Sequence, residues 1–176
     1  MATVSPALDP PLVSEAEFLN LPESMERVEL LDGEVIVAPP PTDRHQAVLG
    51  RLHFALFGWA EAHPPAAVRL APLDVRFGPG RILQPDLFVV LGGLPTGAAT
   101  PLEVVPDVVV EVLSARRSYD RLTKRAVYAE AGVPEYWVVD SVQRLVEVHG
   151  VAHRIVHDVL TTPRLPGFSL PLGPQF

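Results

Sequence analysis

Two carboxylates lie in segments whose other residues are typical of buried strands. Residues 108–114 read VVVEVLS, which places Glu111 between three valines and Val112-Leu113. Asp86 begins a second apolar run, in the segment ILQPDLFVV. An unpaired buried carboxylate is strongly unfavourable, or it loses its charge through a shifted pKa. Each of the two carboxylates therefore needs a cation, a metal ion or a strong hydrogen-bond donor.

A shared metal site would satisfy both carboxylates at once. If two adjacent strands place Asp86 and Glu111 at one end of a sheet, the pair suits Mg²⁺ or Mn²⁺, because these hard ions take a few carboxylate oxygens and keep several waters. The alternative is structural: Asp86 caps a turn after Pro85, and Glu111 pairs with an arginine. We favour the metal site, because apolar residues flank Glu111 on both sides.

A basic segment follows Glu111. Residues 116–125 read RRSYDRLTKR and carry a formal charge of +4, from five basic residues and Asp120. Such runs are usually solvated faces, but this one directly follows the strand of Glu111, so phosphate binding is a second interpretation. Lys124 is the only lysine among 14 basic residues. Lysine is a compact charge whose pKa can shift, and Lys124 lies one helical turn after Asp120, so the two would share a face.

The surrounding elements predict how these residues are positioned. Ser14 and Glu17 form a capping box for a short first helix, and Asp32-Gly33 predicts a hairpin. Helical spacing of apolar residues predicts a long helix over 41–63 and a second over 118–133 that ends near Gly132. Strands are expected at 73–78, 82–91, 106–114, 134–140, 144–150 and 153–160, followed by a proline-rich C-terminal arm over 161–176.

This order of elements predicts an α/β fold with a central mixed sheet. The apolar runs 87–91 and 108–113 indicate central strands covered on both faces. With 176 residues and 48% hydrophobic content, the chain is expected to form one domain over 1–176. The absence of cysteine excludes disulfides and thiolate metal sites.

Charge and hydropathy narrow the class of protein further. The formal net charge of −7 makes uniform coating of nucleic acid unfavourable, although a local basic patch can still bind it. The sequence has no apolar run of bilayer length and no signal-peptide pattern at its start, so we expect a cytoplasmic protein without a membrane partner.

Three histidines, His149, His153 and His157, are spaced by four residues and would align on one helix. The segment VEVHGVAHRIVHDV instead predicts a hairpin around Gly150. We therefore interpret the histidines as polar positions on strands and do not expect a zinc site there.

Several segments together resemble the Uma2 family, also called DUF820, a group of restriction-endonuclease-like proteins. They are ERVELLDGEVIVAPPPTDRHQAVLGRL, QPDLFVV, PDVVVEVLSARRSYDRLTKRAVYAEAGVPEYWVVD and RLVEVHG, and the resemblance covers about residues 14–150. It implies a PD-(D/E)xK nuclease core. Pro85-Asp86 would be the PD pair and Glu111 the next acidic residue. Leu113 stands where that pattern has lysine, and Lys124 matches a lysine that has moved to the following helix.

The resemblance also implies an activity and further site residues. Asp86, Glu111 and Lys124 would be catalytic, and Glu34 would add a third carboxylate to Mg²⁺ (or Mn²⁺). Glu29 and His45 fall at other motif positions, and Asp120 is a further possible site residue. The three arginines of the basic segment would contact the DNA backbone: Arg116, Arg117 and Arg121.

The expected function is metal-dependent hydrolysis of DNA phosphodiester bonds by a homodimer. Two alternatives stay open. A catalytically degenerate nuclease core would bind nucleic acid or a protein partner without turnover. The same residues would otherwise hydrolyse a different phosphorylated substrate.

Overall fold

The computed structural model describes residues 12–22, 24, 26–113, 122–173 and 176. The first helix, α1 (Glu15–Leu19), begins with the predicted capping box: the Ser14 side chain accepts from the Glu17 amide, and the Ser14 amide donates to the Glu17 carboxylate at 2.8 Å. The hairpin is also confirmed. It joins β1 (Val28–Leu31) to β2 (Glu34–Val37) through Asp32 and Gly33, both at positive φ.

The hairpin belongs to a four-stranded sheet in the order β2-β1-β5-β4. The other two strands are β4 (Val75–Gly78) and β5 (Arg81–Leu83), and all pairs in this sheet are antiparallel. α1 packs onto it through Phe18, which contacts Leu30 and Ile82 in a small apolar cluster.

The second sheet has six strands in the order β10-β9-β8-β7-β6-β3. Their bounds are β3 (Ala67–Leu70), β6 (Leu87–Val90), β7 (Val108–Val112), β8 (Glu135–Asp140), β9 (Leu145–His149) and β10 (Arg154–Val156). β7 and β8 are parallel and the other neighbours antiparallel, so the sheet is mixed, as predicted. Every residue of β6 and β7 is buried, which confirms that these strands are covered on both faces.

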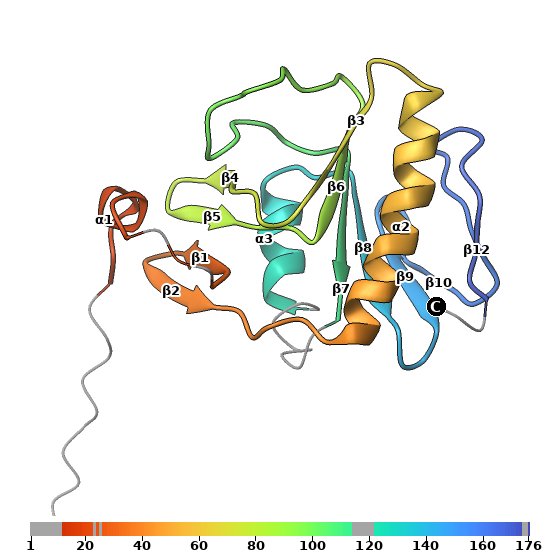
Figure 1. Cartoon of the computed structure of the whole chain (residues 1–176), viewed down its shortest axis with the longest axis horizontal. Helices are drawn as coiled ribbons and strands as arrows, with labels where there is room; N and C mark the ends of the chain where they lie inside the picture. Colours follow the sequence, from red (N-terminus) through yellow and green to blue (C-terminus); the bar gives the residue numbers. More distant parts are fainter. Residues whose placement is uncertain (1–11, 23, 25, 114–121, 174–175) are drawn as a thin grey trace, which may run out of the picture.

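Alternation along the central strands assigns their side chains to two cores. Val108, Val110 and Val112 face the long helix α2 (Asp43–Glu61) and the C-terminal residues. Val109 faces the opposite core, with α3 (Lys124–Glu130) and side chains of the four-stranded sheet. Figure 1 shows β6 and β7 between α2 and α3, with the small sheet beside them. Glu111, which alternates with Val110, points toward α3.

The structure differs from the predicted strands in three places. Segment 82–91 is not one strand: it breaks at Gln84-Pro85-Asp86, and β5 and β6 belong to different sheets, because proline cannot donate to a ladder. Segment 153–160 likewise divides into β10 and β11 (Val159–Leu160). β3 was not predicted, since its AVRL sequence is short and lacks a clear pattern.

The helices and the C-terminal arm follow the predictions more closely. α2 matches the expected long helix, and α3 ends next to Gly132, which adopts a positive φ of 82°. The first part of the predicted second helix lies outside the described residues. The arm forms β12 (Leu170–Pro171) against β11 and buries Leu165, Phe168 and Phe176 in the core beneath α2.

We predict that Phe88→Ala lowers the free energy of unfolding by about 3–5 kcal/mol, because Phe88 is fully buried and its removal leaves a cavity in the core on the α3 side. Phe54→Ala is the matched control, since Phe54 is 83% exposed on α2. Urea denaturation of both variants checks the prediction, and equal losses would contradict it.

Candidate functional site

The register of the central strands brings Asp86 and Glu111 together. Leu87 pairs with Val110, so the residue before Leu87 falls beside the residue after Val110, on the same face of the sheet. The amide of Val112 donates to Asp86 Oδ2 at 2.8 Å. Both carboxylates are buried. The two acids therefore share one end of β6 and β7, as their sequence positions suggested.

α3 brings a cation and a phenol to Glu111. Lys124, the first residue of the helix, donates from Nζ to Glu111 Oε1 at 2.8 Å and to Glu29 Oε1 at 2.9 Å. Tyr128, one helical turn later, donates its hydroxyl to Glu111 Oε1 at 2.7 Å. Lys124 and Tyr128 are both buried. Oε1 of Glu111 thus accepts two hydrogen bonds, and Oε2 faces Arg27 instead.

Arg27, the residue before β1, brings a second cation. Arg27 Nη1 donates to Asp86 Oδ1 at 2.5 Å, and Nη2 lies 3.6 Å from Glu111 Oε2 and 3.4 Å from Glu29 Oε1. Nη2 also donates to the carbonyl of Gln84. Arg27 and Glu29 lie two positions apart, so strand alternation points both toward the same site.

His45 completes the group from the start of α2. Thr42 caps this helix and accepts from the His45 amide at 3.2 Å, which fixes the first turn. His45 Nε2 lies 3.1 Å from Asp86 Oδ2. We call Arg27, Glu29, His45, Asp86, Glu111 and Lys124 the carboxylate cluster; it joins both sheets, α2 and α3.

The two central carboxylates differ in their acidity. Burial alone would raise the pKa of Asp86, but the hydrogen bond from His45 and the charge of Arg27 hold it well below its usual range. Burial raises the pKa of Glu111 to about 7 against the opposing charge of Lys124. Burial would lower the pKa of Lys124, but the charges of Glu111 and Glu29 raise it above its ordinary value. Lys124 is therefore a cation at neutral pH.

The donor set of the cluster fits a hard divalent ion. Asp86 Oδ1 and Glu111 Oε2 both face the Arg27 guanidinium, so these two oxygens already converge on one positive group. The remaining oxygens of the two acids are held by His45, Val112, Lys124 and Tyr128. Mg²⁺ is commonly bound through one or two carboxylates together with waters and substrate phosphate. Two oriented carboxylate oxygens meet that requirement.

Comparison with known proteins identifies the family and the fold of the chain. The family described as "Uma2: Putative restriction endonuclease" matches residues 15–173. The chain belongs to the Uma2 family. A solved structure, described as a "putative nuclease belonging to DUF820" from Anabaena variabilis ATCC 29413, superposes with a TM-score of 0.79 at 22% identity. The match covers 91% of this chain and 95% of that one, which confirms the predicted fold. No curated protein matches the chain significantly.

The structure places the residues predicted for a Uma2 site as follows. Asp86, Glu111, Lys124, Glu29 and His45 all lie in the carboxylate cluster. Glu34 does not: it is exposed at the start of β2, opposite Leu31, and within the described residues no hydrogen bond or ion pair joins it to the cluster. Glu29, two residues further from the turn, supplies the hairpin's carboxylate instead. Four predicted residues lie outside the described residues: Arg116, Arg117, Asp120 and Arg121.

Two residues that contact the carboxylates of the cluster, Arg27 and Tyr128, were not predicted from the sequence. Arg27 precedes Glu29 by two positions, and the i, i+2 spacing in a strand was the available signal. Tyr128 follows Lys124 by four positions, one turn along the same helix face. The acids that Arg27 and Tyr128 contact lie far away in the sequence. Local spacing therefore does not predict which acid each side chain will contact.

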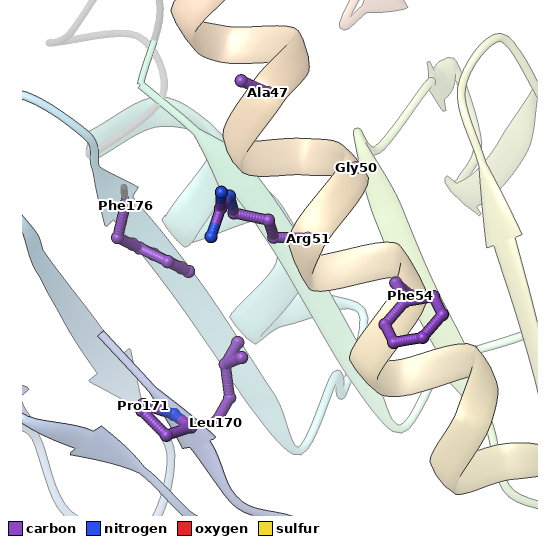
Figure 2. A pocket seen from close by; sticks show the side chains of 7 residues that line it. All are labelled: Ala47, Gly50, Arg51, Phe54, Leu170, Pro171 and Phe176. Carbon is purple, nitrogen blue, oxygen red and sulfur yellow. The ribbon is translucent and has the colours of Figure 1, made fainter. Parts of the chain in front are cut away.

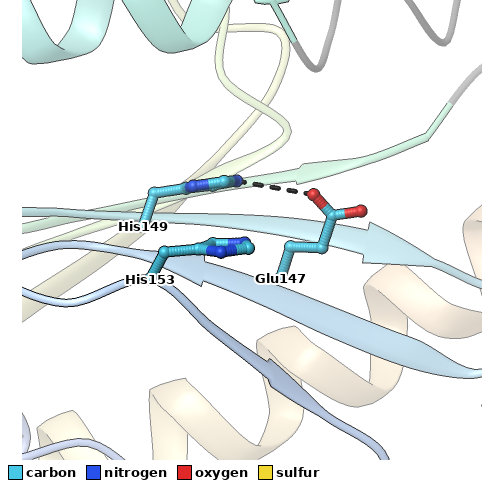
Figure 3. A group of neighbouring side chains, drawn as sticks. All are labelled: Glu147, His149 and His153. Atoms are coloured by element: carbon cyan, nitrogen blue, oxygen red, sulfur yellow. Dashed lines mark ion pairs between the residues drawn. The ribbon is translucent and has the colours of Figure 1, made fainter.

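A second group of potential ligands lies away from the cluster, in the hairpin of β9 and β10 (Figure 3). The ligand atoms of Glu147, His149 and His153 all lie within 4.8 Å of one another. His157 is exposed and does not belong to this group. The predicted hairpin is confirmed, since Arg154 pairs with Val148 and brings His153 across from His149.

A pocket of about 370 Å³ lies between α2 and the C-terminal arm, as Figure 2 shows. Arg51 and Phe54 line it from the helix, and Leu170, Pro171 and Phe176 line it from the arm. No residue of the carboxylate cluster lines this pocket. The described helices include none that is long and apolar enough to cross a membrane.

We predict that Lys124→Met lowers the free energy of unfolding by about 3–5 kcal/mol, because it removes the buried ammonium group that pairs with both Glu29 and Glu111. Arg125→Met is the control, since the neighbouring residue is exposed. Adding Glu111→Gln to Lys124→Met should recover about 0.5–3 kcal/mol through their coupling. Chemical denaturation measures these three variants and Glu111→Gln alone, and strictly additive losses would refute a direct ion pair.

Proposed function

We propose that this chain is a Mg²⁺- or Mn²⁺-dependent endonuclease that hydrolyses DNA phosphodiester bonds. The observation that carries the proposal is the convergence of Asp86 Oδ1 and Glu111 Oε2 on one cation, with Lys124 bonded to the other oxygen of Glu111. Membership of the Uma2 family supports a nuclease. The divalent ion and the DNA substrate are the parts of the proposal that go beyond these observations.

Asp86 and Glu111 would hold the ion through their two converging oxygens. When bound, a divalent ion supplies a water of lowered pKa and neutralises charge on the phosphate. His45 and the Val112 amide fix Asp86 Oδ2, so that Oδ1 keeps its direction. Glu29 contributes mainly by holding Lys124 and by accepting from the Gln84 amide at 2.9 Å.

Lys124 would act as a fixed positive charge. The charges of Glu111 and Glu29 raise the pKa of Lys124 by more than burial lowers it. Lys124 therefore stays protonated and does not serve as a base. Two carboxylates orient its ammonium group, which would place the positive charge beside the reacting phosphate. Such preorganised donors are most effective where charge develops in the transition state.

Contacts to the DNA backbone would come from Arg116, Arg117 and Arg121, between β7 and α3. In the sequence these residues follow Glu111 and precede Lys124, two members of the carboxylate cluster. A homodimer would supply one site for each DNA strand; sedimentation velocity tests this part of the proposal.

A binding module without turnover is the second candidate. The observation that favours it is the set of ion pairs between Arg27 and the three acids, since a permanently bound guanidinium would exclude the ion. Binding of DNA without cleavage at any divalent ion would support this candidate. Cleavage of a small phosphodiester but not DNA would instead indicate a different phosphorylated substrate.

We predict that the purified protein nicks plasmid DNA with Mg²⁺ or Mn²⁺ and that Asp86→Asn, Glu111→Gln and Lys124→Met each reduce the rate by about 10²-fold or more. Glu103→Gln is the matched control, because Glu103 is an exposed carboxylate paired with Arg76 away from the cluster. Circular dichroism confirms folding of each variant. Cleavage that persists at equal rate in all three cluster variants, or that is absent from the native protein with both ions, would overturn the proposal.

A further inference from the structure

We infer that Arg27 occupies the metal position in the ion-free protein, and that a divalent ion binds only when the Arg27 guanidinium leaves Asp86 and Glu111. This inference rests on the proposed function, because it concerns the same pair of carboxylate oxygens. It assigns to a residue outside the PD-(D/E)xK pattern the control of access to the site.

The contacts of Arg27 are those that an ion would need. Its Nη1 and Nη2 atoms reach one oxygen each of Asp86 and Glu111, at 2.5 Å and 3.6 Å, and Nη2 also lies 3.4 Å from Glu29. The other oxygens of Asp86 and Glu111 already have donors from His45, Lys124 and Tyr128. A guanidinium and an ion therefore compete for the same two oxygens.

Charge balance favours exchange over addition. In the state with all three carboxylates ionised and His45 neutral, the acids face two cations, Arg27 and Lys124, and the cluster has a formal charge of −1. A divalent ion in place of Arg27 makes the cluster neutral. An ion added beside Arg27 would leave an excess positive charge among buried groups, which is unfavourable.

Two features of Arg27 favour departure of its side chain, namely its exposure and the separate anchoring of its backbone. The side chain is 23% exposed, whereas the side chains of its three acidic partners are 1–3% exposed, so it forms the solvent-facing side of the cluster. Its backbone is fixed separately, because the Ala38 amide donates to the Arg27 carbonyl at 2.8 Å. Exchange therefore requires rotation of one side chain about a fixed backbone.

The measured affinity for the ion then equals the intrinsic affinity of the open site multiplied by the fraction of molecules in which Arg27 has left. A minor state is commonly populated at about 0.1–10%. We therefore predict that Arg27→Met binds Mg²⁺ about tenfold more tightly, or better, in isothermal titration calorimetry. Its melting temperature should also rise more with Mg²⁺ than that of the native protein.

Three matched variants separate exchange from a general charge effect. Arg44→Met removes an arginine from the first turn of α2, next to His45, and should leave the Mg²⁺ affinity within about twofold. Arg27→Lys keeps the charge but lacks the forked donors, so its affinity should lie between those of the native protein and Arg27→Met. Arg27→Met combined with Asp86→Asn should not bind Mg²⁺.

A direct readout follows the guanidinium itself. The side-chain ¹⁵N resonances of Arg27, assigned by their loss in Arg27→Met, should move on Mg²⁺ titration and exchange faster with water. Unmoved resonances with saturable Mg²⁺ binding, or an Arg27→Met affinity equal to the native value, would overturn this inference alone. Absence of Mg²⁺ binding in both the native protein and Arg27→Met would overturn it together with metal dependence in the proposed function.

A second, independent inference concerns the hairpin of β9 and β10. Although the sequence alone led us to expect no zinc site at these histidines, we propose that Glu147, His149 and His153 bind a transition-metal ion such as Zn²⁺, separately from the carboxylate cluster. Imidazole and carboxylate are ligands that Zn²⁺ accepts, whereas Mg²⁺ prefers oxygen alone.

The strand geometry explains why these three ligands converge. Glu147 and His149 are two positions apart on β9 and share a face, and His153 lies across from His149 just before β10. The two imidazoles stack with centroids 4.6 Å apart, and His149 Nε2 lies 3.5 Å from a Glu147 oxygen. Figure 3 shows both rings directed toward the carboxylate.

We predict that metal-free protein binds one Zn²⁺ per chain at this group in calorimetry, and that His153→Ala reduces the affinity at least about tenfold. His157→Ala is the matched control, because His157 is exposed on the same hairpin and is outside the group. Asp86→Asn should retain this Zn²⁺ binding. Equal affinity in His153→Ala and His157→Ala, or no Zn²⁺ binding by the native protein, would overturn the proposal.

Discussion

The buried ion pair between Glu111 and Lys124 is the constraint on which the rest of the structure depends. Both charges lie in the interior, where an ion pair is stable only if its remaining hydrogen-bonding capacity is also met. Tyr128 and Glu29 meet it, one from the helix that carries the lysine and one from the hairpin of the small sheet. The central strand, α3 and the small sheet must therefore come together at one point, because each of them supplies a member of this hydrogen-bonded group.

The break between β5 and β6 is also needed to bring these groups together. Here the chain leaves the small sheet and enters the large one, and Pro85 prevents the two strands from merging into one ladder. The break exposes the Gln84 amide and carbonyl, which bond Glu29 and Arg27, and it places Asp86 beside Glu111. The PD pair thus has a structural reason that is independent of catalysis: it closes the junction of the two sheets while directing a carboxylate into it.

The sequence predicted the members of the site that sit in strong patterns. Glu111 was visible because valines surround it, Asp86 because it begins an apolar run, and Lys124 because no other lysine exists. Arg27 was not visible, since it is one of 13 arginines and its role arises from acids that lie 59 and 84 positions away in the chain. The resemblance named both Glu29 and Glu34, and only Glu29 lies in the cluster, because the register of the hairpin places Glu34 opposite Leu31, nearer the turn.

The two cations of the cluster differ in a way that matches their positions. An arginine stays charged under all ordinary conditions. The surrounding acids raise the pKa of Arg27 by more than burial lowers it. Deprotonation therefore cannot release Asp86 and Glu111; only movement of the guanidinium can, and Arg27 is placed at the solvent-facing side where movement is possible. Lys124 is compact and enclosed by two carboxylates and the small sheet, so it stays where charge is needed. A cluster with arginine outside and lysine inside can exchange one cation for an ion while keeping the other fixed.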